Sequence, residues 1–326
     1  MRGPDADRHV KLLIQFAVEG HSRALIHKLA ETASSFAAAA LASLPVPVSL
    51  RANSQELPMV TIAPSPPKTV SVEIIGSCLV IRLNRPQAKN AINVEMLQAL
   101  AENYTRLSSS PELRSGVLCG EGDTFCAGLD LMDVIPRAIS EGRAMYLKER
   151  QCDPFGLFGP PCTKPVIAAV HGRCYTAGLE LTLAADLCVA ETGTVFGQQE
   201  TTRGIMPLGG GTFRLPRAIG WHNAMNCILA GATFTAEDAH RWGLVQTIAE
   251  RGRHLDEALK LATAVANCAP LGVQAALRNA RLSQSDGDAA AIADIEVSGR
   301  VVAQTEDARE GMMSLMQRRK ANFLGR

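Results

Sequence analysis

The feature that most constrains the fold of this sequence is the alternation of short apolar strands with helical segments downstream of residue 69. Residues 78–83 and 166–170 are short runs rich in β-branched and apolar side chains, which is typical of buried strands. Residues 93–107 carry apolar side chains at helical spacing, with Asn93 as a candidate N-cap. Because this alternation continues over roughly 200 residues, it predicts an α/β core.

Proline marks the boundary upstream of this core. Residues 10–44 have an alanine-rich, partly amphipathic helical pattern that ends before Pro45 and Pro47. Residues 58–67 are proline-rich, which is typical of a linker, and Met59 is an alternative natural start. We therefore expect three regions: a loosely attached helical and proline-rich extension over 1–68, an α/β core over 69–255, and a helical C-terminal region over 256–326.

The composition argues against two classes of partner. The chain has 33 basic and 32 acidic side chains, a formal net charge of +1, and 4% aromatic residues. A nucleic-acid-binding surface needs a basic patch and stacking aromatics, so we expect no nucleic-acid partner. The apolar runs are far shorter than the ~20 residues of a spanning helix, and acidic residues interrupt the first stretch where a signal peptide would lie. We therefore expect no membrane partner and a cytoplasmic location.

The nine cysteines are spread along the chain, and no two have CxxC spacing. Most have apolar neighbours, which is typical of buried free thiols in a reducing compartment. The seven histidines do not add a cluster of ligands, so the sequence predicts no metal site.

Two glycine-rich turns follow strands and offer backbone N–H groups that can stabilise a developing negative charge. Residues 120–130 lead from a strand toward a helix that begins near Asp130. Residues 171–180 lead into an apolar helix whose first turn contains Glu180. Unpaired N–H groups at such positions stabilise an anion or a polarised carbonyl. Taken alone, however, the first segment also fits an ordinary turn, and Glu180 also fits a residue that complements the helix dipole.

A second glutamate, Glu200, lies in a stretch that ends in the glycine run 209–211, which indicates an unusual backbone. The run is no phosphate-binding Walker loop, because no Lys-Ser/Thr follows it. In isolation Glu200 also fits a solvated loop side chain. Together, two N–H sites and two glutamates are the parts needed to stabilise an oxyanion and to move protons beside it.

Six motifs occur in an order that identifies a family. They are Asn84-Arg85-Pro86 with Lys89-Asn90-Ala91, then 125–130, 164–172, 196–198, 210–212 and 319–323. On these motifs the chain from about Val70 to Arg326 resembles the enoyl-CoA hydratase/isomerase family, the crotonase superfamily. The resemblance implies an α/β fold of the crotonase type, a spiral of ββα units followed by a C-terminal helical trimerisation region.

The resemblance also implies roles for individual residues. Family members stabilise the thioester carbonyl of an acyl-CoA with two backbone N–H groups, which by position are those of Ala127 and Ala177. The hydratases place two glutamates around a water molecule, here Glu180 and Glu200, whereas related isomerases keep only the second. The other implied substrate- and CoA-binding residues are Ala88, Asn90, Ala91, Gly128, Leu129, Asp130, Lys320 and Phe323.

The glutamate pair thus favours an enoyl-CoA hydratase, which adds water across the double bond of a 2-enoyl-CoA thioester. No cofactor is expected, because coenzyme A is part of the substrate. A homotrimer or homohexamer is expected, in which Lys320 and Phe323 approach a neighbour's CoA. The alternatives are another crotonase reaction on acyl-CoA, either double-bond isomerisation or thioester hydrolysis, and a non-catalytic binding or scaffolding relative.

The sequence departs from the family pattern around both glutamates. Hydratases usually have three glycines before the first glutamate, but this chain has Thr176-Ala177-Gly178. Arg173 and Tyr175 replace smaller or apolar residues, and Gln199 stands where hydratases often have proline. We expect these changes to affect the acyl-chain preference more than the fold.

Overall fold

The computed structural model describes residues 68–326. The helices expected over 10–44, the proline-rich linker and the alternative start at Met59 lie outside the described residues and stay predictions. Within residues 68–326 no helix combines the length and the apolar character needed to cross a membrane.

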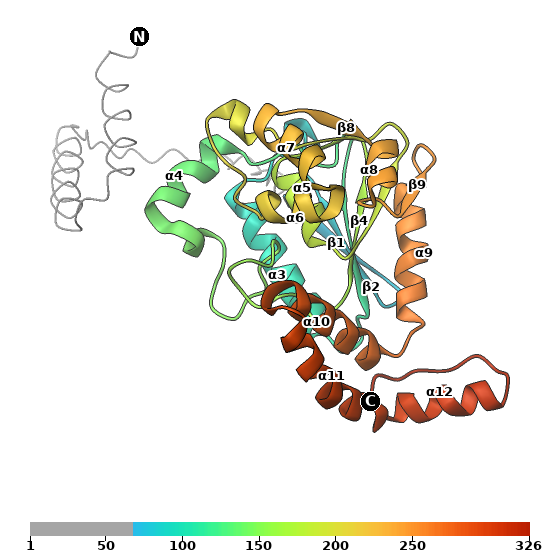
Figure 1. The fold of residues 1–326 in the computed structure, drawn as a ribbon. Coiled ribbons are helices and arrows are strands. Elements are labelled where there is room, and N and C mark those ends of the chain that lie inside the picture. Colours follow the sequence, from blue (N-terminus) through green and yellow to red (C-terminus); the bar gives the residue numbers. More distant parts are fainter. Residues whose placement is uncertain (1–67) are drawn as a thin grey trace, which may run out of the picture. The chain divides into compact units, whose positions relative to one another are not determined.

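A six-stranded sheet lies at the centre of the described part (Figure 1). Its strand order is β1-β2-β3-β4-β6-β9, with β1 antiparallel to β2 and all later neighbours parallel. The strands are β1 (Val70–Ile75), β2 (Cys78–Leu83), β3 (Ser115–Gly120), β4 (Val166–Val170), β6 (Leu187–Glu191) and β9 (Thr247–Ala249). Parallel neighbours require crossover connections, so this sheet confirms the predicted α/β core.

A second, three-stranded sheet has the order β5-β7-β8. It contains β5 (Arg173–Tyr175), β7 (Val195–Gly197) and β8 (Thr233–Thr235). Strand β5 pairs in parallel with β7, and β7 pairs antiparallel with β8. The sheet matters for function because β5 and β7 run directly into the two segments that carry Glu180 and Glu200.

Helices connect and cover these sheets. They are α3 (Val94–Ser109), α4 (Leu131–Glu141), α5 (Ala177–Ala184), α6 (Gly211–Ile219), α7 (Trp221–Ala230), α8 (Ala236–Trp242), α9 (His254–Ala266), α10 (Pro270–Asp286), α11 (Asp288–Ala303) and α12 (Glu306–Met316). Short 3-10 helices are η1 (Pro86–Ala88), η2 (Gly142–Met145) and η3 (Glu200–Arg203). The predicted N-cap of α3 is confirmed, since the Asn93 side chain accepts a hydrogen bond from the Met96 amide at 3.0 Å.

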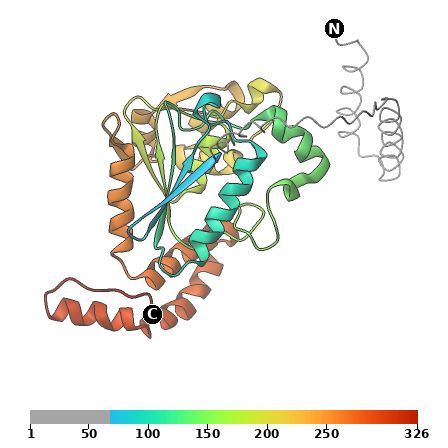
Figure 2. The ribbon, with the colours of Figure 1, turned by 180° about the vertical axis from the view of Figure 1, so that it is seen from behind.

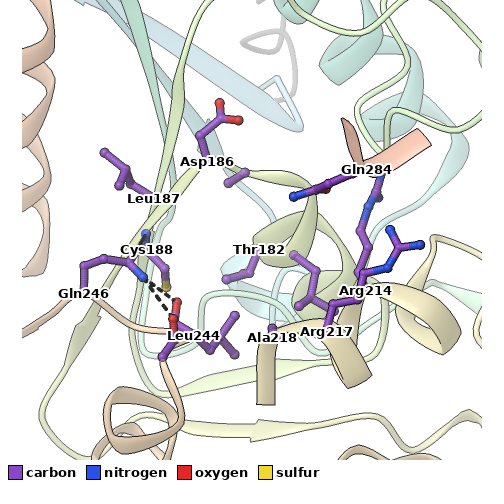
Figure 3. A pocket seen from close by; sticks show the side chains of 13 residues that line it. Thr182, Asp186, Leu187, Cys188, Arg214, Arg217, Ala218, Leu244, Gln246 and Gln284 are labelled. Atoms are coloured by element: carbon purple, nitrogen blue, oxygen red, sulfur yellow. Dashed lines mark hydrogen bonds between the residues drawn. The ribbon is translucent and has the colours of Figure 1, made fainter. Parts of the chain in front are cut away.

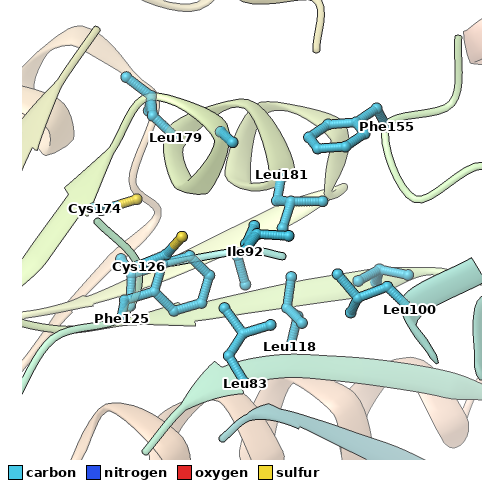
Figure 4. Close-up of a cluster of buried hydrophobic side chains, with 14 of the residues drawn as sticks. Leu83, Ile92, Leu100, Leu118, Phe125, Cys126, Phe155, Cys174, Leu179 and Leu181 are labelled. Atoms are coloured by element: carbon cyan, nitrogen blue, oxygen red, sulfur yellow. The ribbon is translucent and has the colours of Figure 1, made fainter. Parts of the chain in front are cut away.

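The large sheet buries a different set of side chains on each face, because successive residues of a strand point in opposite directions. In β2, Leu79 and Ile81 enter the larger core, while Val80 enters a smaller core under α9. Figure 2 shows α9 and α3 on opposite sides of the sheet. In the larger core, Phe155 packs near α5, which presents Leu181 (Figure 4).

Eight of the nine cysteines are buried free thiols, and Cys268 is exposed. This agrees with the expectation that most of them pack as small apolar side chains.

Candidate active site

Three chain segments that the sequence separates widely lie side by side next to α5. The Cys126 amide donates to the Arg173 carbonyl at 3.0 Å, and the Tyr175 amide donates back to the Cys126 carbonyl at 2.9 Å. The Thr176 amide donates to the Gly197 carbonyl at 2.8 Å. The two predicted glycine-rich turns and the strand before Glu200 therefore form one continuous structure.

Glu180 is 3% exposed and lies in the first turn of α5. Its Oε1 accepts hydrogen bonds from the amides of Gly209 (2.7 Å) and Gly211 (2.9 Å), which converge on it from the start of α6. Burial raises the pKa of Glu180 to about 7, and the nearby charge of Glu200 adds to this rise, while the two amides and Arg214 oppose it. Glu180 thus gains and loses its proton near neutral pH.

Glu200 is the first residue of η3 and is 6% exposed. Its Oε1 accepts a hydrogen bond from Nε2 of the fully buried Gln198 at 2.7 Å. Its Oε2 accepts no hydrogen bond from any described residue, so this oxygen is free to act on a reactant. Burial raises the pKa of Glu200 as well. Two buried carboxyls whose charges repel each other titrate as a pair and hold one proton over part of the pH range.

The backbone N–H groups are placed differently from the prediction in one case. The Ala127 amide donates to the Lys89 carbonyl at 3.0 Å, so it is not available to a substrate oxygen, and its predicted role is wrong. The Leu129 amide has no acceptor within residues 68–326. The reason is a parallel bridge between Ile92 and Leu129. In this bridge the Ile92 amide donates to the Gly128 carbonyl, and the Asp130 amide donates to the Ile92 carbonyl. The N–H of Leu129, between these two residues, therefore points away from Ile92.

Ala177 agrees better with its prediction. It is the first residue of α5, and its amide has no acceptor in the described part of the chain, as expected for the first turn of a helix. Its neighbour Thr176 packs on Gly128: a Cβ on Gly128 would lie only 2.0 Å from the Thr176 Oγ1. The free amides of Leu129 and Ala177 therefore come from two segments in direct contact.

The side chain of Asn90 is occupied by contacts within the protein, so its predicted part in binding substrate or CoA stays a prediction that would fall to its backbone. It is 0% exposed, and it accepts from the Arg85 amide (2.8 Å) while donating to the carbonyls of Glu121 (2.8 Å) and Thr124 (2.8 Å). Both N–H donors of the side chain and its carbonyl oxygen are thereby used to hold two loops together.

The other residues predicted on these loops lie beside Asn90. Asp130 forms a half-buried ion pair with Arg85 at 3.2 Å, and Arg85 also donates to the Ala91 carbonyl at 2.6 Å. Ala88 ends η1 and is half-buried, like Ala91. These contacts hold the loop of residues 84–93, which contains η1, next to the loop of residues 121–130.

The structure does not bring Lys320 and Phe323 to the glutamates of their own chain. They follow α12, and Figure 1 shows this terminus beyond α10 and α11, at the opposite end of the described part from α6 and α7. The Phe323 carbonyl accepts a hydrogen bond from Arg114 at 2.5 Å. These two residues could therefore contribute only to the active site of another subunit.

Several contributors to the site were not predicted from the sequence. They are the amides of Gly209 and Gly211 on Glu180, and Gln198 on Glu200. The glycine run 209–211 is the sequence signal for the first two, and Gln198 belongs to the family motif 196–198, which assigned it no role. Two adjacent cavities of about 330 and 860 Å³ lie past the C-terminal end of α5, and neither is lined by Glu180 or Glu200; Figure 3 shows the smaller one. Among residues 68–326 no group of three potential metal ligands occurs.

Known proteins match this chain over the same region. Residues 73–326 match the sequence model of a family described as enoyl-CoA hydratase/isomerase. An enoyl-CoA hydratase of Mycobacterium tuberculosis is 33% identical over 259 residues, covering 78% of this chain and 96% of that protein. A 2,3-dehydroadipyl-CoA hydratase of Escherichia coli is 34% identical over 252 residues, covering 76% of this chain and 95% of that protein.

Solved structures give the same result. The crystal structure of a probable enoyl-CoA hydratase/isomerase from Mycobacterium abscessus has a TM-score of 0.76 at 43% identity, covering 79% of this chain and 99% of that one. That of an enoyl-CoA hydratase from Mycobacterium tuberculosis has a TM-score of 0.72 at 36% identity, covering 79% of this chain and all of that one (100%). The predicted crotonase-type α/β fold is thereby confirmed, and the chain belongs to the enoyl-CoA hydratase/isomerase family.

Proposed function

We propose that this protein is an enoyl-CoA hydratase, which adds water across the double bond of a 2-enoyl-CoA thioester. The observation that carries the proposal is the buried pair Glu180 and Glu200, each held by its own hydrogen-bond donors and close enough for their charges to interact. Related isomerases keep only the carboxylate at the position of Glu200, so the presence of both favours hydration. The hydratases among the matched proteins support the same reaction.

The backbone stabilises the charge that the reaction develops. When the hydroxyl of water adds to the β-carbon, electrons move onto the thioester oxygen and form an enolate. The amides of Leu129 and Ala177 donate hydrogen bonds to this oxygen, and the N-terminal end of α5 adds its favourable dipole. By analogy with other oxyanion holes, each donor contributes on the order of 3 kcal/mol to transition-state stabilisation.

The glutamate pair moves the protons. One carboxylate accepts a proton from the attacking water, and the other, protonated, delivers one to the α-carbon, so the pair ends with the same number of protons. The raised pKa of Glu180, about 7, allows the pair to hold its one proton up to neutral pH. The Oε2 atom of Glu200, which accepts no hydrogen bond from the described residues, is the oxygen best able to accept one from the water.

The assembly is proposed to be a homotrimer or homohexamer in the cytoplasm. Apolar side chains of the C-terminal helices are exposed in the single chain: Ile292, Ile295, Val297, Val301, Met312, Met313, Leu315 and Met316. Exposed apolar groups of this extent are typical of an interface. Contact between subunits would also bring Lys320 and Phe323 toward a neighbour's CoA. Light scattering measures the assembly, and a fully active monomer would contradict it.

Hydration of crotonyl-CoA tests the function directly, because the reaction removes the absorbance of the conjugated enoyl-thioester. We expect turnover by the unmodified protein and a loss of at least ~100-fold in kcat for Glu180→Gln and for Glu200→Gln. Glu250→Gln, at an exposed position, is the matched control and should retain full activity. CoA release or 3-enoyl-CoA isomerisation without hydration would identify another crotonase reaction, and CoA binding without turnover would identify a non-catalytic relative.

A further inference from the structure

Arg214 connects two loops that lie against the catalytic glutamate. It is half-buried in α6, and its Nη1 donates to the Phe155 carbonyl at 2.6 Å and, more weakly, to the Gly209 carbonyl at 3.4 Å. Its Nη2 lies 3.4 Å from the Gly156 carbonyl. The guanidinium therefore joins the 153–158 loop to the start of the glycine run 209–211.

Gly209 is packed between Glu180 and Phe155. A Cβ on Gly209 would lie 2.7 Å from the Glu180 Oε2 and 2.7 Å from the Phe155 ring. The Gly209 amide donates to Glu180, while its carbonyl accepts from Arg214. Movement of this residue toward or away from Phe155 would therefore move a hydrogen-bond donor of the glutamate.

The 153–158 loop is held together by hydrogen bonds to one buried carboxylate. Buried Asp153 accepts hydrogen bonds from the amides of Phe155 (3.0 Å), Leu157 (2.9 Å) and Phe158 (2.9 Å). Burial lowers the pKa of Arg214, and the nearby negative charge of Asp153 opposes this and favours the charged guanidinium. The charged groups that act on Arg214 are Asp153, Arg281, Glu180 and Arg217.

We propose that Arg214 is a positioning residue for Glu180: by holding the carbonyls of Phe155 and Gly209, it fixes the backbone amides that orient the glutamate. This inference rests on the proposed hydratase function. Within residues 68–326 Arg214 makes no hydrogen bond to either glutamate, and it positions Glu180 through the peptide groups that it holds. Its positive charge adds a second effect, since it favours the ionised form of Glu180.

The neighbouring Arg217 is the matched control. Both arginines line the same two cavities, and Figure 3 shows them close together on one side. Both also stack on Phe213, at 5.4 Å for Arg214 and 5.7 Å for Arg217. Arg217 is exposed and, within residues 68–326, makes no hydrogen bond to the 153–158 loop or to Gly209. If only the positive charge in the cavity mattered, replacing either arginine would change kcat to the same extent.

The experiment compares Arg214→Met, Arg214→Lys and Arg217→Met in the full chain, with crotonyl-CoA as substrate. We expect Arg214→Met to lower kcat about 10- to 100-fold with a smaller change in KM, because the glutamate is misplaced while CoA binding is retained. The fall of kcat/KM at alkaline pH should move to higher pH in Arg214→Met. Arg214→Lys should keep the original profile but recover only part of kcat, and Arg217→Met should match the unmodified protein.

An infrared titration of the protonated carboxyl band provides a readout that needs no activity. The band that disappears in Glu180→Gln should titrate near pH 7 in the unmodified protein and at higher pH in Arg214→Met. Equal kcat and equal titration in Arg214→Met and the unmodified protein, or equal losses in both arginine variants, would overturn the inference. If the unmodified protein hydrates no enoyl-CoA while the band shifts in Arg214→Met but not in Arg217→Met, the hydratase proposal fails and the specific coupling of Arg214 to Glu180 stands.

Discussion

At the scale of single residues, Glu180 makes the protein less stable as the pH rises. Burial raises its pKa from 4.5 to about 7 in the folded protein, so folding favours the protonated form. Its contribution to the free energy of unfolding is complete below the unfolded pKa and is lost as pH rises through the folded one. Replacing the carboxyl by an amide should therefore increase stability at pH 8, by up to roughly 3 kcal/mol, with little effect at pH 4.5.

Thermal unfolding of Glu180→Gln at both pH values measures this difference. The amide oxygen of Gln can still accept from Gly209 and Gly211, so the hydrogen bonds are retained. Glu250→Gln, at an exposed position, is the control for replacing a carboxyl by an amide away from the site. A Glu180→Gln variant that melts at the same temperature as the unmodified protein at pH 8 would mean that the buried carboxylate has no energetic cost.

Individual site residues were predictable to different degrees. Glu180, Glu200 and Ala177 were located from motifs whose spacing fixes their position relative to a helix start or a strand end. The assignment of the Ala127 amide failed, because the direction of each amide in this loop depends on which residue bridges Ile92, and no local pattern shows that. The structural use of the Asn90 side chain was not predictable either, because the carbonyls that accept its hydrogen bonds belong to another loop.

At the scale of elements, the site depends on the contact between the loops that follow β3 and β4. A Cβ on Gly172 would lie 2.0 Å from the Asp123 carbonyl oxygen, and the backbone there cannot yield as a side chain can. Gly172→Ala should therefore separate the two loops, lowering both melting temperature and kcat. Overpacking of this kind typically costs about 1–3 kcal/mol.

Gly193→Ala is the control for the strain of the backbone itself. Gly193 also has a positive φ, +84° against +58° for Gly172, but a Cβ added to it would meet no atom within 4 Å. Both variants carry the conformational cost of a side chain at positive φ, so the difference between them isolates the loop contact. Equal melting temperatures and equal kcat for the two variants would show that the contact is unimportant.

The elements themselves were predictable where they are long or strongly patterned. Strands β2 and β4 and helix α3 coincide with the apolar runs and helical spacing in the sequence. Strands β5 and β8 were not predicted, because each has only three residues and owes its conformation to pairing with β7. The small sheet that leads into both glutamates is thus a product of tertiary structure.

At the scale of the whole molecule, the residues before the described part have no place in the proposed mechanism. Strand β1 begins at Val70 and closes one edge of the large sheet by pairing along β2. The family match begins at residue 73, and every proposed site residue lies later in the chain. A protein that starts at Met59 should therefore fold, assemble and hydrate enoyl-CoA as the full chain does.

The competing idea is that Leu12, Leu13 and Phe16 dock on the core or on a neighbouring subunit and help to close the site. Melting temperature and crotonyl-CoA hydration, measured for the full chain and for the protein that starts at Met59, separate the two possibilities. A protein that starts at Cys78 is the control for damage, because it lacks β1 and exposes the edge of β2. We expect only this shorter protein to lose stability and activity. A large loss in the protein that starts at Met59 would make the first 58 residues part of the working enzyme.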